Sequence, residues 1–548
     1  MRATSEWMAS GRKGNRPKGE LVVVTGGPGS GKSYVIKKID ETADELELTH
    51  PKLALMASAA NVINGRTLHS ATGMTLMGPS TSLSGQKLEK LKKLHQVGTI
   101  WGIIIDEISA VTYTFFHETD KRFQRIMDCT LPFGGLSVFV FGDFFQLPPP
   151  AGPKTSLFDA VIKTHVHHDP TNDVMRLAAN VFVQFQKLDL TVNIRAQDDP
   201  EWAALLAKLR SDTPNKFAIR DHLVPLLDKL TLTEEEIADD NKWRQAPICV
   251  SGNLHRYALA RARARDIACK LGVPLVMWKL PLKGRHPEAL SVAQLEKAYN
   301  DPRLWGMFIQ GGPVVLNENI RPDRLVSNGT NGVFSSLCLG TEDEDSGDFE
   351  NGAVLTDQAR IDSAVAGEVI ILETPPFSVN VRLILQNGAH ARDYDDVSIS
   401  LGKATIPIMC KHQSKMLKVY VEGLGIIELN TCSHGLDLPT AVTFYKAQGR
   451  TMDRVIACLN DPCQPPKLSF EAIFVFLSRV KHGKNCRILP LHNGANWDHL
   501  NDLQPAKNCI AYMQGFDSNG SWSKTRAQAA LRSITAGKKA PKKKNRKE

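Results

Sequence analysis

The sequence predicts an α/β protein with two parallel sheets and a small antiparallel β-barrel inserted in the second. Apolar runs that each end in a small or acidic residue alternate with helical stretches, which is typical of parallel strands covered by helices. The runs are ELVVVTG (20–26), LALMAS (53–58), WGIIIDE (101–107), VFVFGD (138–143), APICVSG (246–252) and RVIACL (454–459). Their order favours two sheets rather than one.

The barrel is predicted from the stretch between about 330 and 430, where β-like runs become short and Gly, Pro and Asn become frequent. A loop with six acidic residues among 342–350 interrupts it and is expected to be a solvated surface loop. The β-like runs are AVLTD (353–357), EVIILE (368–373), VNVRLIL (379–385), MLKVYVEG (416–423) and GIIELN (425–430).

Length and composition predict a soluble, intracellular protein of about two to four domains. The chain has 548 residues, of which 42% are hydrophobic. No apolar run approaches the roughly 18 residues of a membrane span, and residues 1–20 lack the apolar centre of a secretory signal. The ten cysteines form no CxxC pair, so we expect reduced thiols and no zinc site.

The net charge of +9 is concentrated at the two ends of the chain. Residues 538–548 carry +6 and residues 1–20 carry +3, which leaves the middle formally neutral. We expect both ends to be disordered. The C-terminal run could bind phosphates, act as a nuclear-import signal, or only increase solubility.

A phosphate-binding loop follows the first strand. LVVVTGGPGSGKS places Gly26, four intervening residues, Gly31, Lys32 and Ser33 between a strand and a helix. Glycines let backbone N–H groups turn toward phosphate oxygens, the lysine neutralises charge, and the hydroxyl can bind Mg²⁺. This spacing predicts nucleotide binding.

Two further strands end in polar residues. Asp106 and Glu107 follow the apolar run of isoleucines 103–105. A carboxylate pair beside a phosphate loop can hold Mg²⁺ and polarise water. In VFVFGDFFQLPPP, the strand stops at Asp143, and three prolines after Gln146 prevent helix and ladder. Ligands lie at the carboxyl edge of such sheets, although a polar turn that only caps a core strand is the alternative.

Taken together, the motifs resemble those of the petite-integration-frequency (Pif) type of superfamily 1B DNA helicases. The resemblance covers roughly residues 20–490. It is carried in order by GGPGSGKS, GRTLHSATG (65–73), IIIDEIS, FGG (133–135), GDFFQLPP, LTVNIRAQDDPEWAALLAKLR (190–210), GGPVVLNENIRPDRLVSNGTNGV (311–333), AVTFYKAQGRTMDRV (441–455) and VFLSRVKHG (475–483).

The resemblance implies an ATP- and Mg²⁺-dependent helicase that moves 5′-to-3′ on single-stranded DNA as a monomer and unwinds forked DNA. Such helicases act in replication, repair, recombination and telomere maintenance. The implied catalytic residues are Lys32, Asp106, Glu107, Gln146, Arg195 and Arg479. The implied nucleotide-binding residues are Gly26, Gly27, Pro28, Gly29, Ser30, Gly31, Lys32, Ser33, Tyr34, Gln448 and Gly449, with Ser33 and Asp106 on the metal. The implied DNA contacts are Thr67, His69, Ser70, Thr443 and Lys446.

The resemblance also implies two RecA-like P-loop domains. The predicted segments are a basic N-terminus (1–20), the first RecA-like domain (21–190), the second (191–330 and 431–500), the inserted barrel (331–430) and a C-terminal extension with a basic tail (501–548). The two arginines, Arg195 and Arg479, could reach one phosphate only if the second domain closes over the first. Without the motifs, each would be interpreted as a surface ion pair.

The sequence departs from the family pattern at two places. No glutamine precedes Gln86, whereas the family carries one ahead of the phosphate loop to recognise adenine. Tyr445 and Ala447 replace the family's His and Ser. Two other functions stay open: a DNA-binding protein with vestigial ATP chemistry, and a translocase that does not unwind duplexes.

Overall fold

The computed structural model divides into two compact units, which are described separately. The first comprises Met1–Trp243 and Ala447–Glu548, and the second comprises Arg244–Lys446. The structure describes residues 19–74, 83–210, 219–239, 241–283, 290–320, 326, 328–340, 351–384, 404–410, 415–460, 466–492 and 495–536. The basic ends and the acidic loop at 342–350 lie outside the described residues.

The first unit contains a six-stranded sheet in which all neighbours are parallel, as the sequence predicted. Because the strands are parallel, β1, β4 and β5 end at the same edge, and the predicted phosphate loop, Glu107 and Asp143 follow there. In spatial order the strands are β3 (Arg66–Thr67), β2 (Lys52–Ala54), β4 (Gly102–Asp106), β5 (Ser137–Gly142), β1 (Leu21–Gly26) and β6 (Gln186–Leu190).

Helices pack on this sheet through apolar side chains. Ile36 of α2 joins Val24, Ile104 and Phe141 of three neighbouring strands in one buried cluster. Local caps fix where helices begin: Thr112 accepts a hydrogen bond from the N–H of Phe115 (3.1 Å) at the start of α6. The helices of this region are α2 (Lys32–Glu45), α3 (Ala57–Val62), α4 (Leu68–Thr72), α5 (Gly85–Leu94), α6 (Tyr113–Met127), α7 (Leu157–Val161) and α8 (Asp173–Phe182).

The same unit contains a further group of elements, which lie in residues 200–239 and 455–536. Two of its strands, β20 and β21, pair in parallel. The elements are α9 (Pro200–Leu209), α10 (Ile219–His222), α11 (Val224–Leu230), α12 (Glu234–Asp239), β20 (Val455–Ala457), α19 (Phe470–Leu477), β21 (Cys486–Ile488), α20 (Lys507–Gln514) and α21 (Lys524–Ala536).

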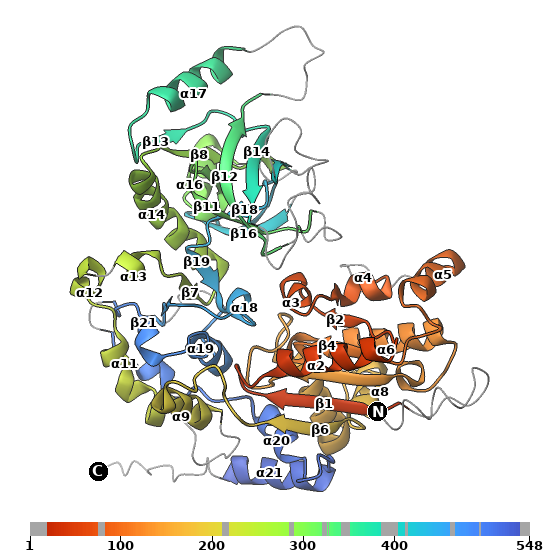
Figure 1. The fold of residues 1–548 in the computed structure, drawn as a ribbon. Helices are drawn as coiled ribbons and strands as arrows, with labels where there is room; N and C mark the ends of the chain where they lie inside the picture. The colour runs from red at the N-terminus through yellow and green to blue at the C-terminus, as the bar shows by residue number, and fades with distance from the viewer. Residues whose placement is uncertain are drawn as a thin grey trace, which may run out of the picture. The chain divides into compact units, whose positions relative to one another are not determined.

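The C-terminal extension packs against the first unit, where helix α20 contacts helix α7 (Figure 1). Tyr512 of α20 is buried and stacks on Phe182 of α8, with ring centroids 5.9 Å apart. It also meets Phe144, just after β5, edge-on at 5.4 Å. Beyond α20, the carbonyl of Gly520 accepts a hydrogen bond of 2.8 Å from the N–H of Lys187 in β6. The extension therefore completes the core of the first unit.

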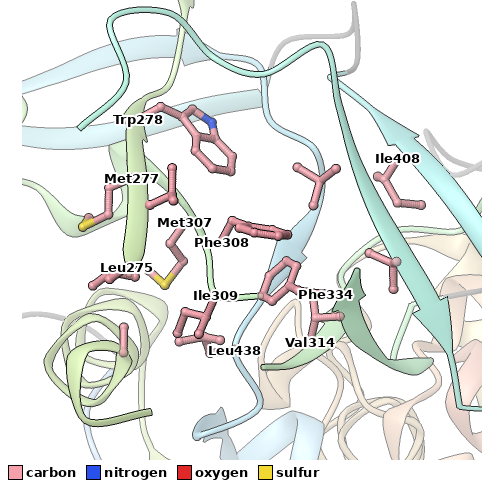
Figure 2. Packing of buried hydrophobic residues seen from close by; sticks show 14 of the residues in the cluster. Leu275, Met277, Trp278, Met307, Phe308, Ile309, Val314, Phe334, Ile408 and Leu438 are labelled. Atoms are coloured by element: carbon pink, nitrogen blue, oxygen red, sulfur yellow. The ribbon is translucent and has the colours of Figure 1, made fainter. Parts of the chain in front are cut away.

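The second unit is built on short sheets around a small buried cluster (Ala298, Leu304, Val419, Val421 and Leu429) and a larger one. Trp278, Met307, Phe308 and Phe334 pack together there, as Figure 2 shows. Strands β7 and β19 are parallel, and α14 lies beside β19. The helical and parallel elements are β7 (Ile248–Val250), α13 (Asn241–Gln245, at the sequence boundary between the units), α14 (Asn253–Leu271), α16 (Val292–Ala298), β19 (Ala441–Thr443) and α18 (Phe444–Ala447, at the other boundary).

Three further sheets account for the stretch predicted as a barrel. A mixed sheet has the order β10 (Trp305–Phe308), β8 (Leu275–Lys279), β13 (Val369–Ile371). An antiparallel sheet has the order β15 (Thr405–Met409), β14 (Ser378–Leu383), β12 (Asn331–Cys338), β11 (Pro313–Leu316), β18 (Leu436–Asp437). A third has the order β16 (Lys415–Val421), β17 (Gly425–Thr431), β9 (Leu282–Lys283). Among the described residues these sheets stay separate, and their strands do not close into a barrel.

One predicted strand is wrong. Residues 353–357 (AVLTD) belong to helix α17, which spans Asn351–Ser363. The apolar run is short, and the residues that follow it, TDQARIDS, include good helix formers such as Gln, Ala and Arg. A run of this length is ambiguous by periodicity alone.

In the part of the chain that the structure describes, every helix is too short or too polar to cross a membrane.

Candidate nucleotide-binding site

The phosphate loop joins β1 to α2 and is shaped by two glycines with positive φ. Gly29 has φ +83° and Gly31 has φ +91°, a conformation that side chains rarely adopt. A Cβ on Gly29 would lie 2.3 Å from the Cβ of Arg195. Gly31 occupies the N-cap of α2 and has no side chain with which to cap the helix, so its first N–H groups can face an anion.

Lys32 folds over this loop. Its Nζ donates to the carbonyls of Gly26 (2.7 Å) and Gly27 (3.1 Å). An ammonium has three N–H donors, so one remains for a phosphate oxygen. Burial lowers the pKa of Lys32, while Asp143, Glu107 and Asp106 oppose this shift.

The predicted carboxylate pair lies at the end of β4. The backbone N–H of Glu107 donates to Asp106 Oδ1 (2.8 Å), and both side chains are buried. Burial and the charge of Glu107 raise the pKa of Asp106 to about 7. Glu107 has φ +52°, which is uncommon for a residue with a side chain and is often found at functional sites.

The loop after β5 brings Gln146 to the same edge. Its backbone N–H donates to the carbonyl of Asp143 (3.0 Å), which closes a turn before the prolines. Asp143 is completely buried, and its Oδ1 accepts a hydrogen bond from Nε of Arg210 (3.2 Å). This pairing was not predicted, although Arg210 is the last residue of the motif that contains Arg195.

Two segments from distant parts of the sequence reach the carboxylates and the phosphate loop. Gln448 Nε2 donates to Glu107 Oε2 at 2.9 Å, and both residues are buried. Nη1 of Arg195 donates to the carbonyl of Ser478 (2.8 Å), next to Arg479. Arg479 is 1% exposed and donates to the carbonyls of Val475 (2.7 Å) and Arg450 (3.1 Å).

Many of these residues line one cavity of about 370 Å³, a volume within the usual range for small-molecule sites. The lining residues come from widely separated parts of the chain, between Pro28 and Arg479. The lining residues are Pro28, Gly29, Gly31, Lys32, Ser33, Tyr34, Ala59, Val62, Asp106, Glu107, Gln146, Ile194, Arg195, Gly449 and Arg479. All six predicted catalytic residues are among them. Of the predicted nucleotide-binding residues, Gly26, Gly27, Ser30 and Gln448 are outside this lining.

The cavity fits a nucleotide with Mg²⁺. Ser30 belongs to the phosphate loop, although it is outside the cavity lining, and its Oγ is buried without a hydrogen-bond partner among the described residues. Ser33 and Asp106 offer a hydroxyl and a carboxylate, the hard oxygen ligands that Mg²⁺ prefers. Sequence reasoning missed the apolar members Ala59, Val62 and Ile194, because isolated apolar residues in a helix and a loop carry no signal.

The predicted DNA contacts divide between the two units. In the first, Thr67 caps α4 by accepting from the N–H of Ser70 (3.3 Å), and Ser70 is exposed. The ring of His69 contacts Phe115 edge-on at 4.5 Å, and burial lowers the pKa of His69. In the second, Thr443 Oγ1 accepts from the N–H of Lys446 (3.4 Å), whose Nζ hydrogen-bonds Asn317.

Comparison with known proteins identifies the first part of the chain. Residues 12–214 match the family model described as PIF1-like helicase. This segment is similar to PIF1-like helicases. The resemblance expected from the motifs is confirmed for this part of the chain.

Curated relatives include a bacterial and a fungal protein. "ATP-dependent DNA helicase Pif1" of Bdellovibrio bacteriovorus is 38% identical over 132 residues, which are 24% of this chain and 30% of that protein. "ATP-dependent DNA helicase PIF1" of Emericella nidulans is 30% identical over 202 residues, or 35% of this chain and 25% of that protein. The match thus spans less than a third of either relative.

Solved structures extend the likeness in fold well beyond that segment. The crystal structure of a Bacteroides Pif1 helicase in complex with ADP-AlF3 and single-stranded DNA aligns with 95% of this chain and 98% of its own, at a TM-score of 0.56 and 18% identity. Bacteroides Pif1 bound to single-stranded DNA aligns with 86% of this chain and 88% of its own, at 0.53 and 20% identity. The fold is therefore an α/β fold with a parallel-sheet core, similar to these structures.

Proposed function

We propose that this protein is an ATP-dependent DNA helicase that moves 5′-to-3′ on single-stranded DNA and unwinds forked duplexes, in DNA replication, repair or recombination. We also propose two RecA-like domains, within the boundaries predicted from the sequence, a small insertion of antiparallel strands in the second, and action as a monomer. The relatives are named ATP-dependent DNA helicases, which supports the proposal.

One observation carries it. Lys32, Glu107, Arg195 and Arg479 line a single cavity although up to 447 positions separate them in the sequence. A cation on the phosphate loop, a carboxylate and two arginines are the groups that phosphoryl transfer to water requires. Each of them could be structural alone, but their meeting at a P-loop favours ATP hydrolysis.

The geometry supports the following proposed roles. Lys32 and the loop N–H groups bind the phosphates, and Gln146 contacts the γ-phosphate. Glu107 accepts a proton from the attacking water. Gln448 holds the Glu107 carboxylate in place by donating a hydrogen bond of 2.9 Å to it. Arg195 and Arg479 stabilise the charge that develops on the transferred group. When bound by Ser33 and Asp106, Mg²⁺ supplies further charge neutralisation at the phosphates.

Movement along DNA requires that hydrolysis change the position of a DNA-contacting group. Gln448 connects the carboxylate Glu107 to the segment that also holds Thr443 and Lys446. Such a segment can transmit loss of the γ-phosphate to the DNA contacts. We propose that Thr67, His69 and Ser70 hold the strand backbone together with Thr443 and Lys446.

The test is ATP hydrolysis with and without single-stranded DNA, with strand displacement on duplexes that bear a 5′ or a 3′ tail. Wild-type protein should show DNA-stimulated turnover and unwinding only from the 5′ tail. Glu107→Gln should reduce turnover by about 10²–10⁴-fold while ATP still binds.

Glu89→Gln is the matched control, since Glu89 lies exposed on α5 and should behave as wild type. Stimulated turnover without strand displacement would identify a translocase. DNA binding without any turnover would contradict the proposed ATPase.

A further inference from the structure

The nucleotide cavity has apolar lining residues, here called its apolar side, that the proposed chemistry does not use. Four of its lining residues are Tyr34, Ala59, Val62 and Ile194. Tyr34, Val62 and Ile194 are 62%, 58% and 51% exposed, which is unusual for three large apolar side chains around one cavity. Exposed apolar clusters of this kind often mark a ligand-binding surface.

These residues are held next to the phosphate loop by elements already described. Tyr34 follows Ser33 directly in the first turn of α2, and its ring lies 5.7 Å from Nζ of Lys38 one turn later. The N–H of Ile194 donates to the carbonyl of Gly29 (2.9 Å), which fixes Ile194 beside the loop. Val62 is the last residue of α3.

The polar residues of the cavity already have tasks at the phosphates. The loop and Lys32 bind the phosphate chain, the carboxylates serve metal and water, and the arginines and Gln146 contact the transferred group. A nucleoside triphosphate bound in this orientation has its base as the remaining apolar, planar part. The residues left to receive it are Tyr34, Ala59, Val62 and Ile194.

We propose that this apolar side binds the nucleobase by stacking and van der Waals contact, so that purine and pyrimidine nucleoside triphosphates all serve as substrates. The inference rests on the proposed function, since it concerns the nucleotide that the same site would hydrolyse. It assigns to Tyr34, Val62 and Ile194 a role in binding the base without distinguishing it.

The physical reason is that nucleobases differ at their hydrogen-bonding edges and share their flat faces. Stacking on a side-chain ring tolerates every base because each has a π-face. A site that hydrogen-bonds a substrate edge can reject an analogue by about 10⁴–10⁵-fold, whereas an apolar pocket discriminates by only about 10²-fold. Among the described lining residues, the base side offers aliphatic side chains and one exposed tyrosine ring.

The first experiment measures kcat/KM for ATP, GTP, CTP and UTP on the full chain, at saturating single-stranded DNA and Mg²⁺. We expect the four values to agree within about tenfold. A preference of more than about a hundredfold for any one base would overturn the inference, because apolar contacts do not provide it.

Direct binding makes the test independent of turnover. Dissociation constants are measured for non-hydrolysable analogues of the same four nucleotides, and for tripolyphosphate, which has no base. Similar constants for the four analogues support the inference even if nothing is hydrolysed. Absence of turnover with all four would then contradict the proposed function alone.

Substitutions locate the effect. Tyr34→Ala should weaken binding of all four analogues by the same factor, about tenfold for the loss of one stacking partner, and leave tripolyphosphate binding unchanged. Tyr34→Phe should bind as wild type, because the ring is kept. Leu46→Ala, at the far end of α2 and 42% exposed, is the control. A loss confined to the ATP analogue, or no loss, would overturn the inference.

Discussion

At the scale of single residues, the phosphate loop depends on backbone freedom as much as on charge. Gly29 combines a positive φ with a close approach to the segment that carries Arg195. Asn193 Oδ1 would also lie 2.7 Å from a Cβ on Gly29. Side chains on this loop therefore conflict both with its own conformation and with the arginine segment.

We expect Gly29→Ala to raise KM for ATP by about tenfold or more, since an L-residue in the left-handed region costs about 1–2 kcal/mol before any clash. Steady-state hydrolysis and the dissociation constant of ATP check this expectation. Gly85→Ala is the matched control: Gly85 begins α5, and a Cβ there meets no atom within 4 Å. Equal behaviour of the two variants would contradict this account of the loop.

The candidate site was largely predictable at this scale because phosphate chemistry demands few residue types at fixed spacings. Lys32, Asp106 and Glu107 follow strands that are visible as apolar runs, so their meeting at one sheet edge could be inferred. The pairing of Arg210 with Asp143 could not, because 67 positions separate them and an arginine at a helix end is ordinary. The apolar lining carried no sequence signal for the same reason.

At the scale of elements, helix α20 is the part of the structure that sequence reasoning did not place. Tyr512 lies in an aromatic cluster with Phe144 and Phe182, which belong to the loop after β5 and to α8. Sγ of Cys509 donates to the carbonyl of Phe144 (3.2 Å), two residues before Gln146. A contact between two distant segments leaves no periodic pattern in the sequence of either segment. The bounds of the extension could therefore be predicted, but not the surface on which it packs.

Truncating this aromatic anchor should destabilise the first unit. Tyr512→Ala should lower the free energy of unfolding by about 3–5 kcal/mol, as for other buried aromatic residues. Tyr512→Phe should be neutral or stabilising by about 1 kcal/mol, because the hydroxyl is buried without a partner among the described residues. Chemical denaturation of both variants gives the two values. A loss in Tyr512→Phe equal to that in Tyr512→Ala would show that the hydroxyl, and not the ring, stabilises the core.

The strands illustrate what element prediction rests on. Continuous apolar runs such as ELVVVTG and WGIIIDE were located correctly because a strand buried on both faces needs them. AVLTD was assigned wrongly because five residues fit a strand or a helix equally well, and the helix-forming residues after it decided the outcome. The barrel was inferred from short runs of the same kind. A local pattern can indicate a strand, but it does not indicate which sheet the strand joins, and in the described residues these strands lie in three separate sheets.

At the scale of the whole molecule, buried and half-buried histidines make stability depend on pH. Burial lowers the pKa of five histidines in the described residues: His69, His95, His117, His165 and His434. The unfolded chain therefore binds their protons at a higher pH than the folded protein does. Their contribution to stability is fully present above pH 6.5 and is lost as the pH falls through their lowered pKa values.

His95 isolates one such contribution. It is 4% exposed, its Nε2 lies 2.7 Å from the carbonyl of Ala71, and burial lowers its pKa. The stability difference between wild type and His95→Gln should shrink below pH 6.5, by at most about 1.4 kcal/mol per pH unit. Denaturant unfolding of both proteins at pH 7.5 and 5.5 measures it. Because Asp106 has a raised pKa and contributes with the opposite sign, only the difference between the two proteins is informative. A difference that stays constant or widens would contradict the assignment.

The aromatic cluster around Tyr512 also sets an order of events during synthesis. Phe182 leaves the ribosome 330 residues before Tyr512, with the whole second unit made in between. At about 5–20 residues per second, this delay is roughly 15–65 s. For that time the nascent chain carries an apolar face at Phe144 and Phe182 that Tyr512 of α20 has not yet covered. We therefore expect the newborn chain to bind chaperones until α20 has been synthesised, and a chain released by a ribosome that stalls before residue 512 to lack this part of its core.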